Sequence, residues 1–78
     1  MAGGHKIQLT RHVMEQMAKR GIGVSVMRET LRNPDSIELG YDGRKLAVKA
    51  FGNYTYVVVY EEITANEVRA VTAYVRTR

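Results

Sequence analysis

The first third of the chain has apolar residues at the spacing of an α-helix. A first helix is predicted over residues 11–20, between Thr10, whose hydroxyl can cap its first turn, and Gly21, which suits a left-handed C-terminal residue. A second helix is predicted over residues 24–32, because Pro34 disfavours helical backbone in the residue before it. The short link makes the two a helical hairpin. The apolar stripe of the first helix consists of Val13, Met14, Met17 and Ala18.

From Ser36 onward the apolar residues alternate with polar ones, which is typical of β-strands. Asp42-Gly43 favours a two-residue hairpin turn, since both positions must accept positive φ, and Gly52-Asn53 predicts a second tight turn. The pattern predicts an α+β fold, in which the N-terminal helical hairpin packs on one face of a four-stranded antiparallel sheet. The predicted strands are residues 36–41, 44–51, 54–61 and 68–77.

Alternation along these strands sorts the side chains into two faces. We expect the small aliphatic set under the helices and the tyrosine-rich set on an open face. Tyrosines there could stack on bases and cations could contact phosphates, but a homodimer surface, a docking site for a partner protein or a plain exposed sheet has the same composition. The small set is Leu46, Val48, Ala50, Val57, Val59, Val71, Ala73 and Val75. The other set is Lys45, Lys49, Phe51, Tyr54, Tyr56, Tyr60, Thr72, Tyr74 and Arg76.

Length and composition limit the class of protein. With 78 residues we expect a single domain over residues 1–78, in which residues 1–5 form a loose N-terminal segment. There is no cysteine, which excludes disulfides and a thiol nucleophile and agrees with a cytoplasmic location. The sequence has no apolar run long enough to span a membrane. The net charge of +4 favours an anionic partner, such as RNA, DNA or an acidic protein.

His12 is the residue that best suits catalysis. RNA can be cleaved by its own 2′-hydroxyl, which needs a base, an acid and a cation but no metal. We expect His12 to act as general base or acid, Arg20 and Lys49 to hold phosphate, and Tyr74 to stack on a base or donate a proton. Each also has a structural alternative: packing against the sheet edge for His12, a surface cation for Arg20, a cross-strand neighbour for Tyr74. Further expected nucleic-acid contacts are Lys19, Lys45, Lys49, Tyr54, Tyr56, Thr72 and Arg76.

Neither a metal nor a cofactor is predicted. The acidic residues and the two histidines, His5 and His12, do not have the spacing of metal ligands. The glycines at positions 21 and 23 lack the preceding strand and the rest of a phosphate-binding loop.

Four short segments follow one another along the chain: Thr10-Arg11-His12, Arg20-Gly21-Ile22, Asn33-Pro34-Asp35 and Val71-Thr72-Ala73-Tyr74. In this order they resemble a small bacterial family, domain-of-unknown-function family 4258, over about residues 6–74. The resemblance implies a topology similar to the RelE, ParE and BrnT toxins and, more broadly, to barnase- and colicin-like ribonucleases. It implies a toxin-like, metal-independent ribonuclease with an acidic antitoxin-like partner, and places recurrent polar positions at His12, Arg20, Thr72 and Tyr74.

Two other functions stay open. The domain could be a non-catalytic protein-interaction module that forms a homodimer or binds a partner through its open sheet face. It could also be a relative without activity, because the family often has Arg where this chain has Gln16.

Overall fold

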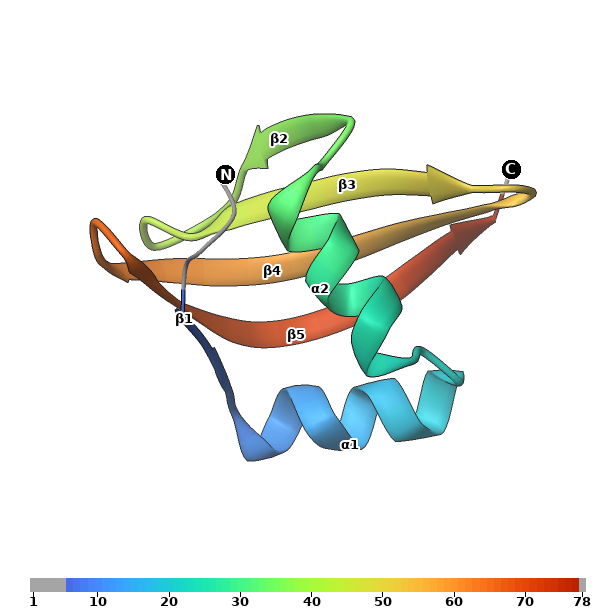
Figure 1. The fold of residues 1–78 in the computed structure, drawn as a ribbon, viewed down its shortest axis with the longest axis horizontal. Helices are drawn as coiled ribbons and strands as arrows, with labels where there is room; N and C mark the ends of the chain where they lie inside the picture. Colours follow the sequence, from blue (N-terminus) through green and yellow to red (C-terminus); the bar gives the residue numbers. More distant parts are fainter. Residues whose placement is uncertain (1–5, 78) are drawn as a thin grey trace.

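The computed structural model describes residues 6–77, which form two helices and five strands (Figure 1). The predicted loose segment 1–5 lies outside the described residues. The α+β class is confirmed. In chain order the elements are β1 (Lys6–Leu9), α1 (Arg11–Arg20), α2 (Val24–Arg32), β2 (Ser36–Leu39), β3 (Lys45–Phe51), β4 (Tyr54–Thr64) and β5 (Glu67–Thr77).

The ends of both helices follow the local signals of the sequence. The Thr10 hydroxyl accepts a hydrogen bond from the Val13 amide at 3.1 Å, and Gly21 ends α1 in the left-handed region with φ 68°. Pro34 follows the end of α2, as expected. The hairpin between β2 and β3 turns at Asp42 and Gly43, which both have positive φ.

The sheet has five strands in the order β1-β5-β4-β3-β2 and is mixed, so the predicted four-stranded antiparallel sheet is wrong. The additional strand is β1, which pairs in parallel with β5. Strand β1 alternates polar and apolar residues, but it is only four residues long, so this signal is weak and was missed. Its partner lies at the other end of the chain, where local signals carry no information about pairing.

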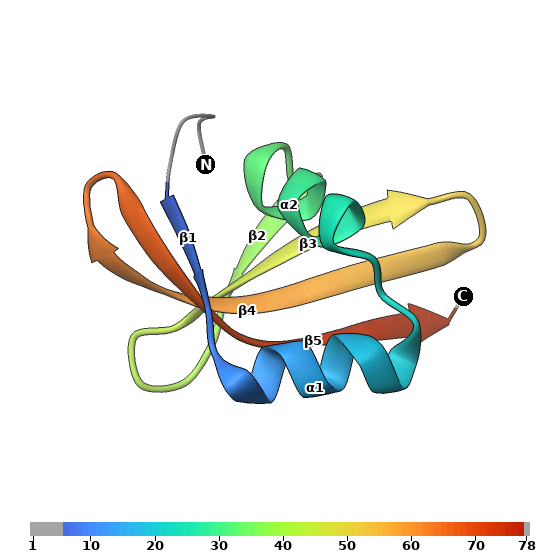
Figure 2. The same ribbon diagram turned by 60° about the horizontal axis from the view of Figure 1, so that its bottom comes forward.

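Both helices contribute to one core on the same side of the sheet. Helix α1 runs along β5, and α2 lies over β3 and β4 (Figure 2). Beneath the helices, the Tyr60 ring packs beside alanines on the neighbouring strands, so a large residue is matched by small ones. The core consists of Val13, Met17, Ile22, Met27, Leu31, Ala47, Val58, Tyr60, Val68, Ala70 and Ala73.

The predicted face assignment is wrong for β3 and β4. Ala47 is opposite Val58, and Val58 is opposite Ala73, so these three residues face the helices together. Because successive residues point to opposite faces, the aliphatic residues expected there lie on the other face. Those residues are Leu46, Val48, Ala50, Val57 and Val59.

A β-bulge makes the two halves of β5 differ in phase. Val59 pairs with Thr72 but Tyr60 pairs with Ala70, which leaves Val71 as an extra residue. Before the bulge, the residue that packs under the helices is even-numbered Ala70, and after it the residue is odd-numbered Ala73. The bulge also changes the phase of Val71, which was expected under the helices.

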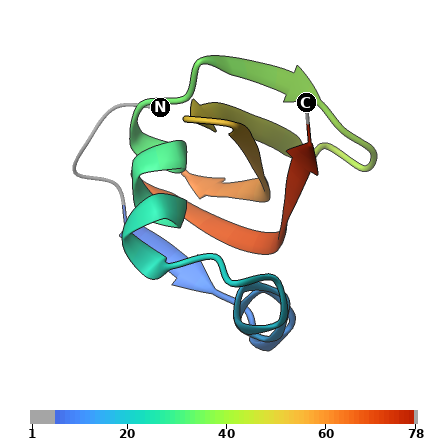
Figure 3. The ribbon, with the colours of Figure 1, turned by 90° about the vertical axis from the view of Figure 1, so that its right-hand side faces the viewer.

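The face away from the helices is buried by curvature of the sheet itself. Val57 has no exposed surface and Val48 is 8% exposed, although both lie on the face opposite the helical core. The sheet curls so far that Arg76 on β5 forms two 3.0 Å hydrogen bonds with Glu38 on β2, although β4 and β3 lie between those strands. Figure 3 shows the end of β5 rising toward β2. We call this inner surface the concave face; it carries Glu38, Leu46, Val48, Val57, Val59, Glu61, Arg69, Thr72, Tyr74 and Arg76.

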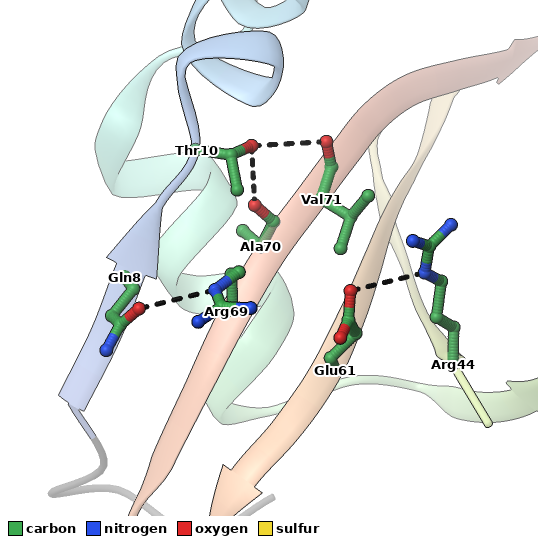
Figure 4. A network of polar contacts seen from close by, with 7 residues as sticks. All are labelled: Gln8, Thr10, Arg44, Glu61, Arg69, Ala70 and Val71. Carbon is green, nitrogen blue, oxygen red and sulfur yellow. Dashed lines mark hydrogen bonds and ion pairs between the residues drawn. The ribbon is translucent and has the colours of Figure 1, made fainter. Parts of the chain in front are cut away.

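Thr10 joins β1, α1 and β5 at one point. Besides capping α1, its hydroxyl lies 3.0 Å from the Ala70 carbonyl oxygen and 3.3 Å from that of Val71 (Figure 4). The hydroxyl therefore donates to β5, just where β1 ends and the pairing along that edge stops.

We expect Thr10→Val to lower the free energy of unfolding by about 1–2 kcal/mol, because it removes both the helix cap and the donor to β5 while keeping the side-chain shape. Urea denaturation measures the change. Thr55→Val is the matched control, since Thr55 is half-buried on the concave side, and it should change stability by less than about 0.5 kcal/mol. Equal effects of the two substitutions would contradict this role of Thr10.

Candidate nucleic-acid interface

A pocket of about 300 Å³ opens at the concave face, beside the turn between β2 and β3. The backbone is close to the lining at Gly40, because an added Cβ would lie 2.8 Å from a methyl carbon of Leu46, which would have to move. The lining is mainly apolar, and Arg44 is its one charged residue. The lining residues are Leu39, Gly40, Tyr41, Arg44, Leu46, Val59 and Tyr74.

Tyr74, Arg76 and Glu38 form a polar group next to this pocket. Tyr74 and Arg76 are two residues apart on β5 and therefore share the concave face. The hydrogen bonds from Arg76 lower the pKa of Glu38 below its ordinary value of 4.5. Hydrogen bonds with Glu38 and then with Tyr74 raise the pKa of Arg76. The guanidinium is thus held in a fixed orientation beside the tyrosine hydroxyl.

Two further arginines lie on the same side of the sheet (Figure 4). The Arg44 Nε donates to Glu61 at 3.3 Å, and the Arg69 Nε donates to the neutral Gln8 side chain at 3.4 Å. The amide of Gln8 in turn donates to Glu67 at 2.6 Å. These contacts hold the arginines in place. Of Arg44, Arg69 and Arg76, only Arg69 has no carboxylate partner among the described residues.

Among the predicted site residues, the structure brings together Thr72, Tyr74 and Arg76 on the concave face. The expectation that Lys45 and Lys49 share that face is wrong. Lys45 forms a 2.7 Å ion pair with Glu62, whose hydrogen bond raises the pKa of the lysine. Both lysines lie on the helix side of β3, because they alternate with Leu46 and Val48 of the concave face.

Lys49 closes the end of α2. Its ammonium donates to the Asn33 carbonyl at 2.7 Å and lies 3.7 Å from the Asp35 carboxylate. This position suits a cation at the negative end of a helix dipole. Lys49 therefore has a structural contact where phosphate binding was expected.

The tyrosines of β4 were also expected on the open face, and that expectation is wrong too. Tyr54, Tyr56 and Tyr60 lie on the helix side of the strand, and burial raises the pKa of Tyr60. Tyr56 packs against the core and meets Phe51 edge to face, with ring centroids 5.5 Å apart. Tyr56 and Tyr60 fill volume in the helix layer, whereas Tyr54 is 54% exposed on the same side of the sheet.

The three predicted catalytic residues make separate contacts. The Arg20 guanidinium donates to the Ala73 carbonyl of β5 at 3.0 Å, and so covers an edge that β1 does not reach. His12 is exposed in the first turn of α1, as is Lys19 in its last turn. Within residues 6–77, no hydrogen bond or ion pair connects His12 with Arg20 or Tyr74.

Sequence reasoning missed Glu38, Arg44, Glu61 and Arg69 as parts of the site. One signal was present: the Asp42-Gly43 turn fixes the register that sets Glu38 opposite Leu46. With β3 assigned to the correct face, this register places Glu38 on the concave face. The pairing of Glu38 with Arg76 had no comparable signal, because it depends on how far the sheet curls.

We expect the stabilising effect of the Glu38–Arg76 pair to depend on pH. The pKa of Glu38 is lower in the folded protein than in the unfolded chain, so the pair stabilises the fold above pH 4.5 and is lost as the pH falls through the lowered value. Glu38→Gln should have a lower urea midpoint than the parent protein at neutral pH, and the difference should close as the pH falls below 4.5 and through the lowered pKa of Glu38. The control is Glu15→Gln, whose carboxylate is exposed and 4.0 Å from Arg11. A gap that persists unchanged in acid would count against the pair.

Among residues 6–77, no three acidic or histidine side chains gather closely enough to hold a metal ion. No helix in the described part of the chain is long and apolar enough to cross a membrane. Neither models of known protein families, nor curated proteins, nor solved structures gave a match to this chain.

Proposed function

We propose that this domain binds RNA on its concave face and cleaves it as a toxin-like, metal-independent endoribonuclease. The observation that carries the proposal is the pocket at this face, where the Tyr41 and Tyr74 side chains and apolar walls lie beside the guanidinium of Arg44. A flat apolar space with aromatic rings suits a nucleobase, and an adjacent arginine suits the phosphate that follows it.

The size and lining of the pocket favour a single base over a larger ligand. A volume of about 300 Å³ is at the lower end of the range for small-molecule sites. Stacking on tyrosine contributes about 1–3 kcal/mol per base, and it tolerates different bases because each has an aromatic face. The pocket therefore supports binding of unpaired RNA with modest sequence preference.

Arg44 is the arginine best placed to bind phosphate. It uses Nε in its contact with Glu61, which leaves the terminal nitrogens of the guanidinium as donors. Arg76 uses both terminal nitrogens on Glu38. We therefore propose that Arg44 contacts the phosphate of the bound RNA before cleavage, and that Arg76 fixes the position of Tyr74.

Cleavage requires two proton transfers. The 2′-hydroxyl loses its proton as its oxygen bonds to phosphorus, and the departing 5′-oxygen gains a proton as its bond to phosphorus breaks. Tyr74 carries a hydroxyl at the pocket and is the proposed proton donor. His12, which is exposed on α1, is the proposed base.

Two substitutions test these roles in one assay of labelled single-stranded RNA with EDTA present. Tyr74→Phe keeps the ring but removes the hydroxyl, so we expect cleavage to fall by about 10²–10⁴-fold while fluorescence anisotropy still reports RNA binding. His12→Ala should reduce cleavage by a similar factor. The protein should stay folded, because this position is exposed. Tyr54→Phe, on the helix side, is the control. Unchanged cleavage in either variant removes that residue from the mechanism.

A partner-binding function has one specific observation in its favour. Strand β2 is a free edge of the sheet, and next to it Leu39 is 87% and Tyr41 is 91% exposed. An exposed apolar edge can accept a strand from another chain, either a second copy or an acidic antitoxin-like protein. The proposed RNA site includes the same residues, so binding at this edge would block it.

Light scattering distinguishes the two functions. If RNA binding is the function, we expect a monomer whose affinity for RNA falls when Leu39 is replaced by lysine, because the pocket loses an apolar wall. If self-association is the function, the parent protein should be a dimer and Leu39→Lys should convert it to a monomer. Ile63→Lys is the matched control, since Ile63 is exposed on β4 away from the pocket.

A further inference from the structure

A second pocket, lined by different residues from the first, lies between β1 and α2. Its volume is about 370 Å³, and no residue is shared with the pocket at the concave face. Three cations converge on it from two elements. The lining consists of Lys6, Ile7, Gln8, Arg28, Arg32 and Glu67.

The three cations of this pocket have no acidic partner among the described residues. The five ion pairs found among the described residues involve other cations, namely Arg11, Arg44, Lys45, Lys49 and Arg76. Residues 1–5, which precede Lys6, contain no acidic residue. None of these three cations is therefore held in an ion pair among the described residues.

The arrangement on α2 is unfavourable unless an anion is bound. Arg28 and Arg32 are one turn apart, where like charges repel each other. The acidic residue between them, Glu29, accepts a hydrogen bond from Asn33 at 3.1 Å. Both arginines are exposed, so their placement side by side contributes nothing to the core.

The single carboxylate of the pocket is already engaged. Glu67 accepts from the Gln8 amide at 2.6 Å, and the other end of that amide accepts from Arg69. Three cations against one engaged carboxylate leave this pocket with a net positive charge.

We propose that Lys6, Arg28 and Arg32 form a binding site for a phosphate group. Two guanidinium groups offer the planar pairs of donors that match phosphate oxygens, and the lysine adds a third positive charge from the facing strand. The phosphate could be free inorganic phosphate or part of an RNA backbone, and the chemistry of recognition is the same. The site does not depend on the pocket at the concave face.

NMR titration of the labelled full chain with inorganic phosphate, at constant ionic strength, tests the site. We expect saturable shifts at the amides of β1 and α2, and an affinity about tenfold weaker in Arg28→Gln or Arg32→Gln. The matched control is Arg11→Gln, which removes the same charge from an exposed position on α1 outside the pocket. Shifts elsewhere only, an absence of saturation, or an equal loss in Arg11→Gln would overturn the proposal.

A second titration, with a short single-stranded RNA, identifies the source of the phosphate. If Arg28→Gln weakens binding of both RNA and inorganic phosphate, the site holds an RNA backbone. If it weakens only inorganic phosphate, the site takes a free phosphate. Either result supports the site, and neither depends on cleavage, which Tyr74→Phe tests separately.

Discussion

The fold depends on one constraint: both faces of the sheet are apolar, but two short helices can cover only one. Burial of apolar surface drives folding, so the uncovered valines must lose contact with water in another way. The sheet achieves this by curling until Val48 and Val57 lie inside it and Arg76 meets Glu38 across the gap. The pocket beside Tyr74 is a consequence, because a curved sheet with one open side leaves a hollow. Stability and the proposed site thus have the same origin.

The edges of the sheet are a second constraint, and they give some polar residues a structural contact. Beyond β1, the outer edge of β5 would expose unpaired carbonyl groups. Thr10 and Arg20 on either end of α1 donate to those groups. This structural contact explains the position of Arg20 without a role in catalysis. Strand β2 has no such cover, and Leu39 remains exposed at that edge.

Local features could be predicted from the sequence, and pairings between distant segments could not. The limits of α1 and α2 and the turn at Asp42-Gly43 follow from caps and φ preferences within a few residues. Strand β1 and the bulge at Val71 depend on partners far along the chain. The face assignment failed because small aliphatic residues were expected in the core, whereas the core uses Tyr60 with alanines. Of the site, Thr72, Tyr74 and Arg76 were found, since alternation along one strand sufficed.

The distribution of charge assigns the attraction of a polyanion and the recognition of its bases to different parts of the surface. Two of the three arginines on the concave face are paired with Glu38 and Glu61, so this face attracts a polyanion weakly and favours contacts that depend on geometry. Three cations without an ion pair, Lys6, Arg28 and Arg32, lie between β1 and α2, where they line one pocket. Long-range attraction follows net local charge, whereas stacking acts only in contact. If both proposals hold, Lys6, Arg28 and Arg32 set how strongly affinity depends on salt, while Tyr74 determines which unpaired bases are bound.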